Sequence, residues 1–387
     1  MLGRIHENAF LGRGMTGAPM QREHHELNNA TRPVALLLAF LSACSTSVGA
    51  GADAAASADA GAGTAFPAAD ARAIASDSTG TKLVVVGVGG GIWTSTDGGS
   101  TWIERAPSGL AHIQQWMSVA SDSTGTNLVA VVNGFYDRPE DDPAAFSGDV
   151  WTSTDSGATW TDQTASSPAH GQEWKSVASD SSGTKLVAVS VGAIWTSTDA
   201  GVTWTNRTEA STGMGRQGWT AVASDATGTN LVAVGYGAGV WASNDGGATW
   251  TDRTPVDPRW QAAYGDQMEG WSSVASDTMG TKLVAAVDTG DIWTSADGGV
   301  TWSDTGPASS WEVWTSVASN STGTNLVAIA ELVNGDNSHV WTSTNGGRTW
   351  TDQSAASPTA SGPWTAVASN AAGDHLVAIG RGVIWVN

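Results

Sequence analysis

Short apolar runs separated by clusters of glycine, serine, asparagine and aspartate recur along most of the chain after residue 70. One repeat shows the pattern well, with apolar or β-branched runs at 174–180, 185–190, 193–199 and 203–208. Runs of this length, bounded by small polar residues, predict strands joined by tight turns. Because helical spacing of apolar positions is absent from the repeats, the chain is predicted to be all-β.

One eleven-residue stretch marks each repeat. "IWTSTDGGSTW" (92–102) has close copies beginning at residues 150, 194, 240, 292 and 340, and a partial seventh copy is "VIWVN" (383–387). The Asp or Asn of successive copies are 58, 44, 46, 52 and 48 residues apart. A period of about 40–50 residues with four strands per unit predicts the blade of a β-propeller. The units begin near Ala71, Trp116, Trp174, Trp219, Trp271, Trp314 and Trp364.

The number of strands predicts how the ring closes. The pattern contains seven first, second and third strands but only six fourth strands. We expect "TAFPAA" (64–69) to supply the missing strand, so that the N- and C-terminal strands share one blade and no sheet edge stays open. The prediction is therefore a seven-bladed β-propeller of four-stranded blades, formed by residues 66–387.

The pattern S-x-D-x-G-x-T-W within each copy resembles the Asp-box, or BNR repeat, of the sialidase-like propeller superfamily. Five copies match fully, and Asn345 replaces the aspartate in the sixth. An Asp carboxylate can accept hydrogen bonds from backbone N–H groups just ahead of it, while the glycine supplies a positive φ and the tryptophan packs between blades. We therefore expect these side chains to be structural and not catalytic. They are Asp97, Asp155, Asp199, Asp245, Asp297 and Asn345.

The strand directions separate two kinds of loop. The first-to-second and third-to-fourth turns fall on one face and are nearly invariant, whereas the second-to-third turns and blade crossovers fall on the opposite face and vary. Nineteen of the 21 tryptophans occupy repeat positions, which leaves Trp260 and Trp311 in crossovers on the variable face. With Tyr136 and Tyr264 they form a candidate ligand-binding set, because exposed aromatic rings suit sugar rings or a protein partner. The alternative is that these rings cap the rim by packing inward.

The resemblance also raises an enzymatic alternative, since the superfamily includes sialidases and other glycoside hydrolases. A sialidase is expected to carry an arginine trio, a Tyr–Glu pair and an N-terminal Arg-Ile-Pro motif, and that motif is missing. Glu173, Glu269 and Glu312 lie at or near crossover ends, where carboxylates can pair as glycosidases require. The simpler interpretation of these residues is that they are solvated loop ends.

Charge and cysteine content exclude several other functions. With 17 basic and 37 acidic residues the net charge is −20, which disfavours nucleic-acid binding. The chain has one cysteine and its histidines show no metal-ligand spacing, so we expect no disulfide, no metal site and no cofactor. The oxygen-rich loop 137–143 suits Ca²⁺ in composition but follows no EF-hand pattern.

The N-terminal region predicts the cellular localisation of the protein. Residues 33–43, "PVALLLAFLSA", are too short to span a bilayer and fit a secretory signal, and "LSAC" ending at Cys44 resembles a bacterial lipobox. We therefore predict a lipoprotein signal peptide at 1–43, lipid on Cys44 and a small-residue tether at 44–65. The alternative for Cys44 is a free thiol buried in an apolar helix. The 32 residues ahead of the apolar run are long for a signal peptide, so translation from Met20 is an alternative to translation from Met1.

Together these features predict a lipid-anchored propeller of the bacterial cell envelope, on the periplasmic face of the outer membrane or at the cell surface. We expect it to be a monomer and a non-catalytic scaffold whose variable loop face binds a protein or carbohydrate ligand. The resemblance extends to the propellers of photosystem assembly factors, which act as binding platforms. The alternative function is that of a sialidase-like glycoside hydrolase acting on exported or surface glycans.

Overall fold

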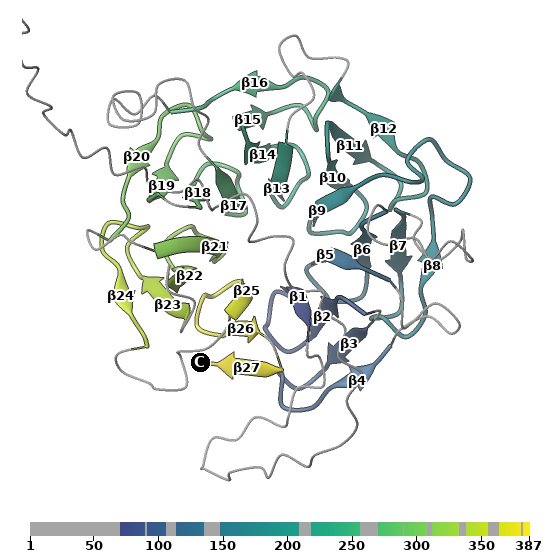
Figure 1. Cartoon of the computed structure of the whole chain (residues 1–387), viewed down its shortest axis with the longest axis horizontal. Coiled ribbons are helices and arrows are strands. Elements are labelled where there is room, and N and C mark those ends of the chain that lie inside the picture. Colours follow the sequence, from purple (N-terminus) through teal and green to yellow (C-terminus); the bar gives the residue numbers. More distant parts are fainter. Residues whose placement is uncertain are drawn as a thin grey trace, which may run out of the picture. The chain divides into compact units, whose positions relative to one another are not determined.

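The computed structural model describes residues 70–89, 91–105, 114–134, 148–208, 218–255, 270–288, 290–307, 312–332, 338–354, 364–380 and 382–387. Its elements are 27 β-strands in seven antiparallel sheets, each a blade arranged around a common centre (Figure 1). The structure is therefore a seven-bladed β-propeller, as the repeat period predicts.

The first strand of each blade lies nearest the centre of the ring (Figure 1). These inner strands are β1 (Ala71–Ser76), β5 (Trp116–Ser121), β9 (Trp174–Ser179), β13 (Gly218–Ser224), β17 (Trp271–Ser276), β21 (Glu312–Ser319) and β25 (Trp364–Ser369). The second strands are β2 (Leu83–Gly87), β6 (Leu128–Val132), β10 (Leu186–Ser190), β14 (Leu231–Tyr236), β18 (Leu283–Val287), β22 (Leu326–Leu332) and β26 (Leu376–Gly380).

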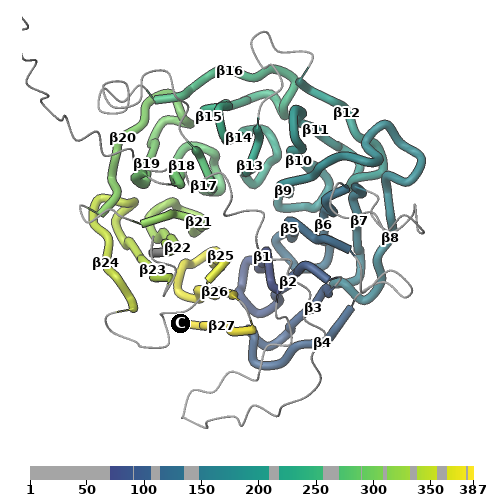
Figure 2. Tube along the Cα trace, viewed as in Figure 1, coloured from purple at the N-terminus to yellow at the C-terminus, as the bar shows by residue number. Residues whose placement is uncertain are grey.

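The third and fourth strands continue each blade outward, and the fourth strands form the rim (Figure 2). The third strands are β3 (Ile92–Ser95), β7 (Val150–Ser153), β11 (Ala193–Ser197), β15 (Gly239–Ser243), β19 (Ile292–Ser295), β23 (Ser338–Ser343) and β27 (Val383–Val386). The fourth strands are β4 (Ile103–Glu104), β8 (Thr161–Asp162), β12 (Thr205–Asn206), β16 (Thr251–Asp252), β20 (Ser303–Asp304) and β24 (Thr351–Asp352).

The core consists of apolar clusters between neighbouring blades. The second strands are buried on both faces because they lie in mid-blade with a neighbouring blade on each side; every residue of β6, for example, is buried. The inner strands contribute the largest buried side chains, and Trp116 and Val119 both belong to the apolar cluster that includes Val84 of blade 1. Residues three apart on a regular strand face opposite sides, so a β-bulge between Trp116 and Ser118 is what turns both toward blade 1.

A ring of backbone hydrogen bonds joins the first-to-second turns of all seven blades. Each turn donates one N–H to a carbonyl of the next blade, with N···O distances of 3.0 or 3.1 Å. The circuit runs through Ser78, Ser123, Ser181, Ala226, Thr278, Ser321, Ala371 and back to Ser78. The contact between blades 7 and 1 is thus of the same kind as the other six, and the Thr365 hydroxyl adds a bond to the Ala71 carbonyl at 2.9 Å.

Blade 7 contains three strands among the described residues, β25, β26 and β27. The segment 64–69, predicted to complete this blade, lies outside the described residues, as do the predicted signal peptide, Cys44 and the tether. In the part of the chain that the structure describes, no helix is long and apolar enough to span a membrane.

Candidate functional site on the loop face

The third-to-fourth turns satisfy their own polar groups. In blade 3 the Asp199 carboxylate accepts the Thr203 N–H at 2.8 Å and the Thr203 hydroxyl at 2.6 Å, and the Ser197 hydroxyl donates to it at 2.8 Å. Burial alone would raise the pKa of Asp199, but the bonds from Thr203 and Ser197 together lower it below its ordinary value. Asn345 keeps the arrangement, accepting the Thr349 N–H at 2.9 Å and donating to its hydroxyl at 2.8 Å.

A second set of buried acidic and amide side chains closes the first-to-second turns, and the sequence reasoning overlooked it. Asp122, 3% exposed, accepts the Thr124 and Thr126 N–H groups and the Asn127 side-chain amide. The signal was available, because this residue follows every inner strand. Its positions are Asp77, Asp122, Asp180, Asp225, Asp277, Asn320 and Asn370. Both invariant turns of this face therefore use their carboxylates internally.

The sequence predicts that the ligand-binding residues lie on the opposite, variable face, and the structure describes two of them. Tyr136, Trp260, Tyr264, Trp311 and Glu269 lie outside the described residues. Glu173 and Glu312 are described, each at the start of an inner strand. The Glu173 carbonyl accepts the Val191 N–H at 3.1 Å, which ties the crossover into blade 3 to the second-to-third turn.

Blade 6 extends farther on the loop face than its neighbours and carries a cluster of ionisable groups. β21 begins at Glu312, two residues before the Trp314 that occupies the first-tryptophan position, and Glu312 pairs with Leu332. The side chain of Glu312 is 6% exposed, and its Oε1 lies 3.9 Å from Nδ1 of His339. The same Nδ1 lies 3.4 Å from Oδ2 of Asp352. Three elements of one blade, β21, β23 and β24, therefore bring two carboxylates and an imidazole together.

The electrostatics of this cluster set Glu312 apart. Burial, and next the nearby Asp352 carboxylate, raise the pKa of Glu312 from 4.5 to about 7. Glu312 Oε2 and His339 Nδ1 are buried atoms without a hydrogen-bond partner. A buried acceptor without a donor is costly, so the cluster has capacity to receive a polar group from outside.

Blade 2 places a second His–carboxylate pair on this face. In the repeat, Asp149 occupies the position just before Val-Trp that His339 occupies in blade 6. Asp149 is 1% exposed, and its Oδ1 lies 2.7 Å from Nδ1 of His170. The Thr164 hydroxyl donates to the same oxygen at 3.1 Å. Sequence reasoning considered the histidines only as metal ligands, and it overlooked these pairings with carboxylates contributed by other strands.

Between blades 4 and 5 the loop face carries a Tyr–Asp pair. The Tyr236 hydroxyl at the end of β14 donates to the Asp288 carboxylate just after β18. Burial, and next that hydrogen bond, raise the pKa of Tyr236 above its ordinary value. The ring lies against Gly270, where an added Cβ would come within 2.4 Å of Tyr236 Cε1. The glycine at the crossover end therefore makes room for the tyrosine, which is 43% exposed.

The described residues show neither a sialidase constellation nor a metal centre. Of the arginines that a sialidase trio would draw on, Arg105 is described, and its Nε donates to the Thr94 hydroxyl at 3.2 Å, beside the outer strand and away from the ring centre. Arg138, Arg216, Arg259 and Arg381 lie outside the described residues. Among the described side chains no group of three or more His, Cys, Asp or Glu is placed to hold a metal ion.

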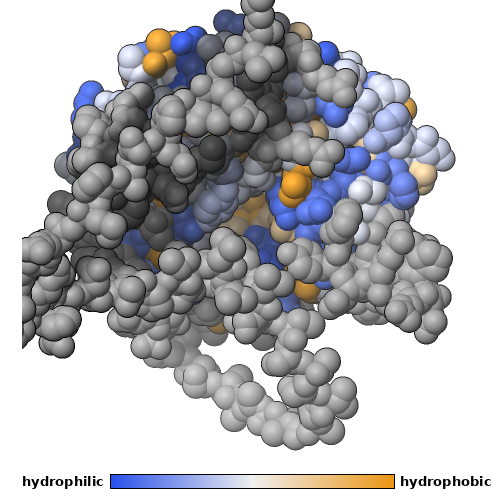
Figure 3. Space-filling model, turned by 45° about the horizontal axis from the view of Figure 1, so that its top comes forward, coloured by the Kyte–Doolittle hydropathy of each residue, from blue (hydrophilic) through white to orange (hydrophobic). Residues whose placement is uncertain are grey.

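The visible surface has no broad apolar patch. On the face shown in Figure 3, the apolar side chains of described residues form separate spots among hydrophilic ones. Large exposed apolar residues are scattered over several blades: Ile103, Val191, Val202, Tyr236, Met279, Val300, Val383 and Val386. Single apolar residues of this kind are ordinary on soluble surfaces.

Comparisons with known proteins identify the fold. No protein-family model matches the sequence, and no curated protein matches it. Among solved structures it is similar to the GH74 enzyme of Niastella koreensis, with 17% identity, a TM-score of 0.62 and 82% of this chain covered. It is also similar to the GH74 xyloglucanase of Xanthomonas campestris, with 15% identity, a TM-score of 0.60 and 84% coverage. The chain spans 52% of the length of each of these enzymes.

A different kind of protein has a similar structure over nearly its whole length. YCF48 bound to D1 peptide shows 16% identity and a TM-score of 0.60, with 84% of this chain and 95% of that chain covered. YCF48 from Cyanidioschyzon merolae gives 15% identity, a TM-score of 0.58, and coverage of 82% and 96%. At these identities the likeness shows that the chain has the β-propeller fold.

Proposed function

We propose that this protein is a non-catalytic binding scaffold that holds a protein or carbohydrate ligand on its loop face. One observation carries the proposal: the Asp and Asn side chains of the invariant turns bond within their own turns, whereas on the loop face Glu312 Oε2 is a buried oxygen without a hydrogen-bond partner. A rigid ring with polar groups left for a ligand on one face is typical of binding propellers. The similarity to YCF48, solved with a bound peptide, supports the same function.

The proposal includes the predicted Asp-box repeat family and the predicted localisation at the cell envelope. The five full S-x-D-x-G-x-T-W copies support an Asp-box propeller, and "LSAC" supports a lipid on Cys44 that holds the propeller at the cell envelope. Cys44→Ser should abolish lipidation while the propeller still folds. Lipid labelling and mass spectrometry of the mature N-terminus test this, and an unlipidated Cys44 in native membrane fractions would overturn the anchor.

The binding experiment starts from the full-length protein in a glycan-array and pull-down screen. Binding of the ligand found there should fall in each of Glu312→Gln, Trp260→Ala and Trp311→Ala without a loss of melting temperature. Asp199→Asn on the opposite face serves as the matched control and should bind normally. If all three loop-face variants bind like the wild type, the ligand site lies elsewhere and the proposal is wrong.

A second function is favoured by one specific observation, the pKa of about 7 of Glu312 beside the Asp352 carboxylate. A carboxyl that stays protonated near neutral pH next to an ionised one is the arrangement of a glycosidase acid–base pair. This alternative predicts hydrolysis of xyloglucan or sialoside substrates that Glu312→Gln abolishes. The absence of hydrolysis by a preparation that binds its ligand would leave the scaffold as the function.

A further inference from the structure

A repeated contact links the fourth strand of a blade to its third strand. The residue just after the fourth strand donates its side-chain N–H to the hydroxyl of the third-strand threonine. The pairs are Arg105–Thr94 at 3.2 Å, Gln163–Thr152 at 2.8 Å, Arg207–Thr196 at 2.8 Å and Gln353–Thr342 at 2.7 Å. Arginine or glutamine serves equally in this position, because each offers a donor at the same reach.

Blade 5 lacks the contact because Thr305, which bonds the Ile292 carbonyl, replaces the arginine or glutamine. Blade 4 lacks it for a different reason. Its third strand reads "VWASN" where blades 1, 2, 3, 5 and 6 carry threonine after the tryptophan, so Ala242 stands in the threonine position. The Arg253 backbone keeps its usual bond to the Val240 carbonyl at 2.8 Å. Its guanidinium group, however, has no hydrogen-bond or ion-pair partner among the described residues.

The same change opens a space between blades 4 and 5. In four other interfaces the threonine methyl reaches the turn glycine of the next blade: a Cβ added at Gly247, for example, would lie 2.7 Å from Thr196 Cγ2. At Gly299 the nearest blade-4 atom to such a Cβ would be Ala242 Cβ, at 3.8 Å. The missing hydroxyl and methyl therefore leave a gap at this interface.

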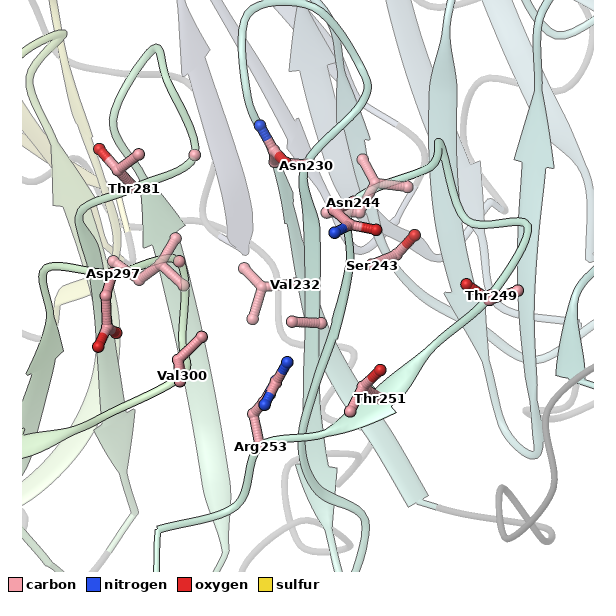
Figure 4. Close-up of a pocket in the computed structure, with 15 residues that line it drawn as sticks. Asn230, Val232, Ser243, Asn244, Thr249, Thr251, Arg253, Thr281, Asp297 and Val300 are labelled. Carbon is pink, nitrogen blue, oxygen red and sulfur yellow. The ribbon is translucent and has the colours of Figure 1, made fainter.

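A cavity of about 250 Å³ occupies this interface and reaches the first-to-second and third-to-fourth turns. Leu231, Val232 and Leu283 supply apolar wall, and Asn244, Thr249 and Thr281 add polar groups. Figure 4 shows the Arg253 guanidinium directed into the gap between Val232 and Val300. An adjoining hollow of about 350 Å³, lined by Arg253, Trp293 and Trp302, continues toward the rim.

We propose that this cavity is a binding site for a small organic monocarboxylate, with the Arg253 guanidinium as the group that pairs with the carboxylate. The site is distinct from the Glu312 cluster of the loop-face function, because it lies between blades 4 and 5 and includes residues of the first-to-second and third-to-fourth turns. Guanidinium and carboxylate form paired charge-assisted hydrogen bonds, and the Leu and Val side chains suit a short apolar body.

The negative charge around the cavity favours a ligand with one negative charge over a ligand with two. Asp297 also lines the cavity, and the bonds from Thr301 that lower its pKa keep it ionised. In Figure 4 Val300 lies between this carboxylate and the Arg253 guanidinium. One arginine in a chain of net charge −20 cannot balance a dianion such as a phosphate ester.

The test uses the full-length protein with benzoate as the probe and benzamide as its neutral analogue. Benzoate binding is measured by calorimetry and by the shift of the Arg253 Nε–H resonance. We expect benzoate to bind at least about tenfold more tightly than benzamide, as expected for one charge-assisted pair. Arg253→Gln and Ala242→Thr should each weaken benzoate binding by at least the same factor. Gln353 and Thr196 occupy these positions in other blades, so both replacements fit the fold.

The matched control is Arg207→Gln in blade 3, where the arginine is already paired with Thr196, and it should leave benzoate binding unchanged. Melting temperatures of all three variants report whether the ring is intact. The proposal is overturned if benzoate does not bind, if benzamide binds equally well, or if Arg253→Gln or Ala242→Thr retains full affinity.

Discussion

At the scale of single residues, the repeated carboxylates stabilise turns through hydrogen bonds made within the same turn. Removing Asp199 would leave the Thr203 N–H and the Ser197 hydroxyl without an acceptor. We expect Asp199→Ala to lower the free energy of unfolding by about 1 kcal/mol, because this turn is partly solvated and water compensates in part. Thermal and urea melts measure the change.

The control for this prediction is already present in the chain. Asn345 makes the equivalent contacts, so Asp199→Asn should keep most of the stability that Asp199→Ala loses. Equal losses in both variants would mean that the charge, and not the hydrogen-bond geometry, stabilises the turn.

Glu312 predicts a pH dependence of opposite sign to that of the turn aspartates. Its pKa is about 7 in the folded protein and ordinarily 4.5, so between these values the folded state holds a proton that the unfolded state has released. Stability should therefore fall as pH rises from about 4.5 to 7, by at most about 1.4 kcal/mol per pH unit, and stay level above 7.

The Glu312→Gln variant tests this prediction, because an amide removes the titration without changing the shape. The slope of unfolding free energy between pH 5 and 7 should flatten, and the variant should be more stable than the wild type at pH 8. His339 and Asp352 face Glu312, so His339→Asn and Asp352→Asn are measured in parallel. If the slope persists in Glu312→Gln but disappears in His339→Asn or in Asp352→Asn, then His339 or Asp352, respectively, causes the pH dependence.

Sequence reasoning identified the turn aspartates at the residue scale but not the paired ionisable groups. The turns are local, with every contact within four residues, so a repeated motif contains all the information. Glu312, His339 and Asp352 meet only because β21, β23 and β24 lie in one sheet. Two turn residues also depart from expectation, since Ser156 and Ala200 adopt a φ of 59° where other blades use glycine.

At the scale of elements, the strands and their order followed from the sequence because each apolar run ends at a turn signal. In the repeat at 174–208 the structure gives β9 at Trp174–Ser179 and β10 at Leu186–Ser190, within a residue of the predicted runs. The fourth strand is shorter, Thr205–Asn206, because an outer strand pairs on one side and its pattern continues into the turn. The bulges after the inner tryptophans left no signal in the pattern.

The crossover lengths give a second candidate for the fourth strand of blade 7. Asp162 precedes Trp174 by twelve positions, and Asp352 precedes Trp364 by the same number. Ala71 occupies the tryptophan position in blade 1, and twelve positions before it stands Asp59. Other crossovers differ in length, since Asp304 precedes Trp314 by ten positions. The strand at 64–69 therefore stays a prediction, and 58–59 is a second candidate for the same edge.

Two replacements distinguish these assignments. If 58–59 forms the edge strand, substituting residues 57–60 by a Gly-Ser stretch should lower the melting temperature more than the same substitution at 64–67. Amide exchange of Val383 and Val386 gives a local measure of pairing at β27. A larger effect from the 64–67 substitution would support the strand at 64–69.

At the scale of the whole molecule, stability depends on closing the ring. Blade 1 buries Ile74 and Val85 against Ala366 and Ile379 of blade 7. Deleting residues 364–387 would expose this face of blade 1 and the facing surface of blade 6, and it would break the ring of turn hydrogen bonds at Ala371. We expect the shortened chain to aggregate or to unfold well below the wild-type melting temperature.

Calorimetry and size-exclusion chromatography test this expectation. The intact chain should unfold in one transition, and the deletion variant should lose it. A soluble six-bladed product with a similar melting temperature would show that each blade is stable with its neighbour alone, as in an open solenoid.

The ring of backbone hydrogen bonds between the first-to-second turns is closed, so no blade is distinguished as the first. Each turn makes the same bond to the next blade, so the contacts that hold the blades together contain no record of where the polypeptide starts. A permuted gene that joins residue 387 to the segment ahead of residue 70, so that the predicted fourth strand of blade 7 is kept, and that opens the chain at another crossover would keep all seven bonds. Order along the gene and order around the ring are therefore separable in this protein, and a new terminus can be placed beside whichever blade a fusion partner needs to reach.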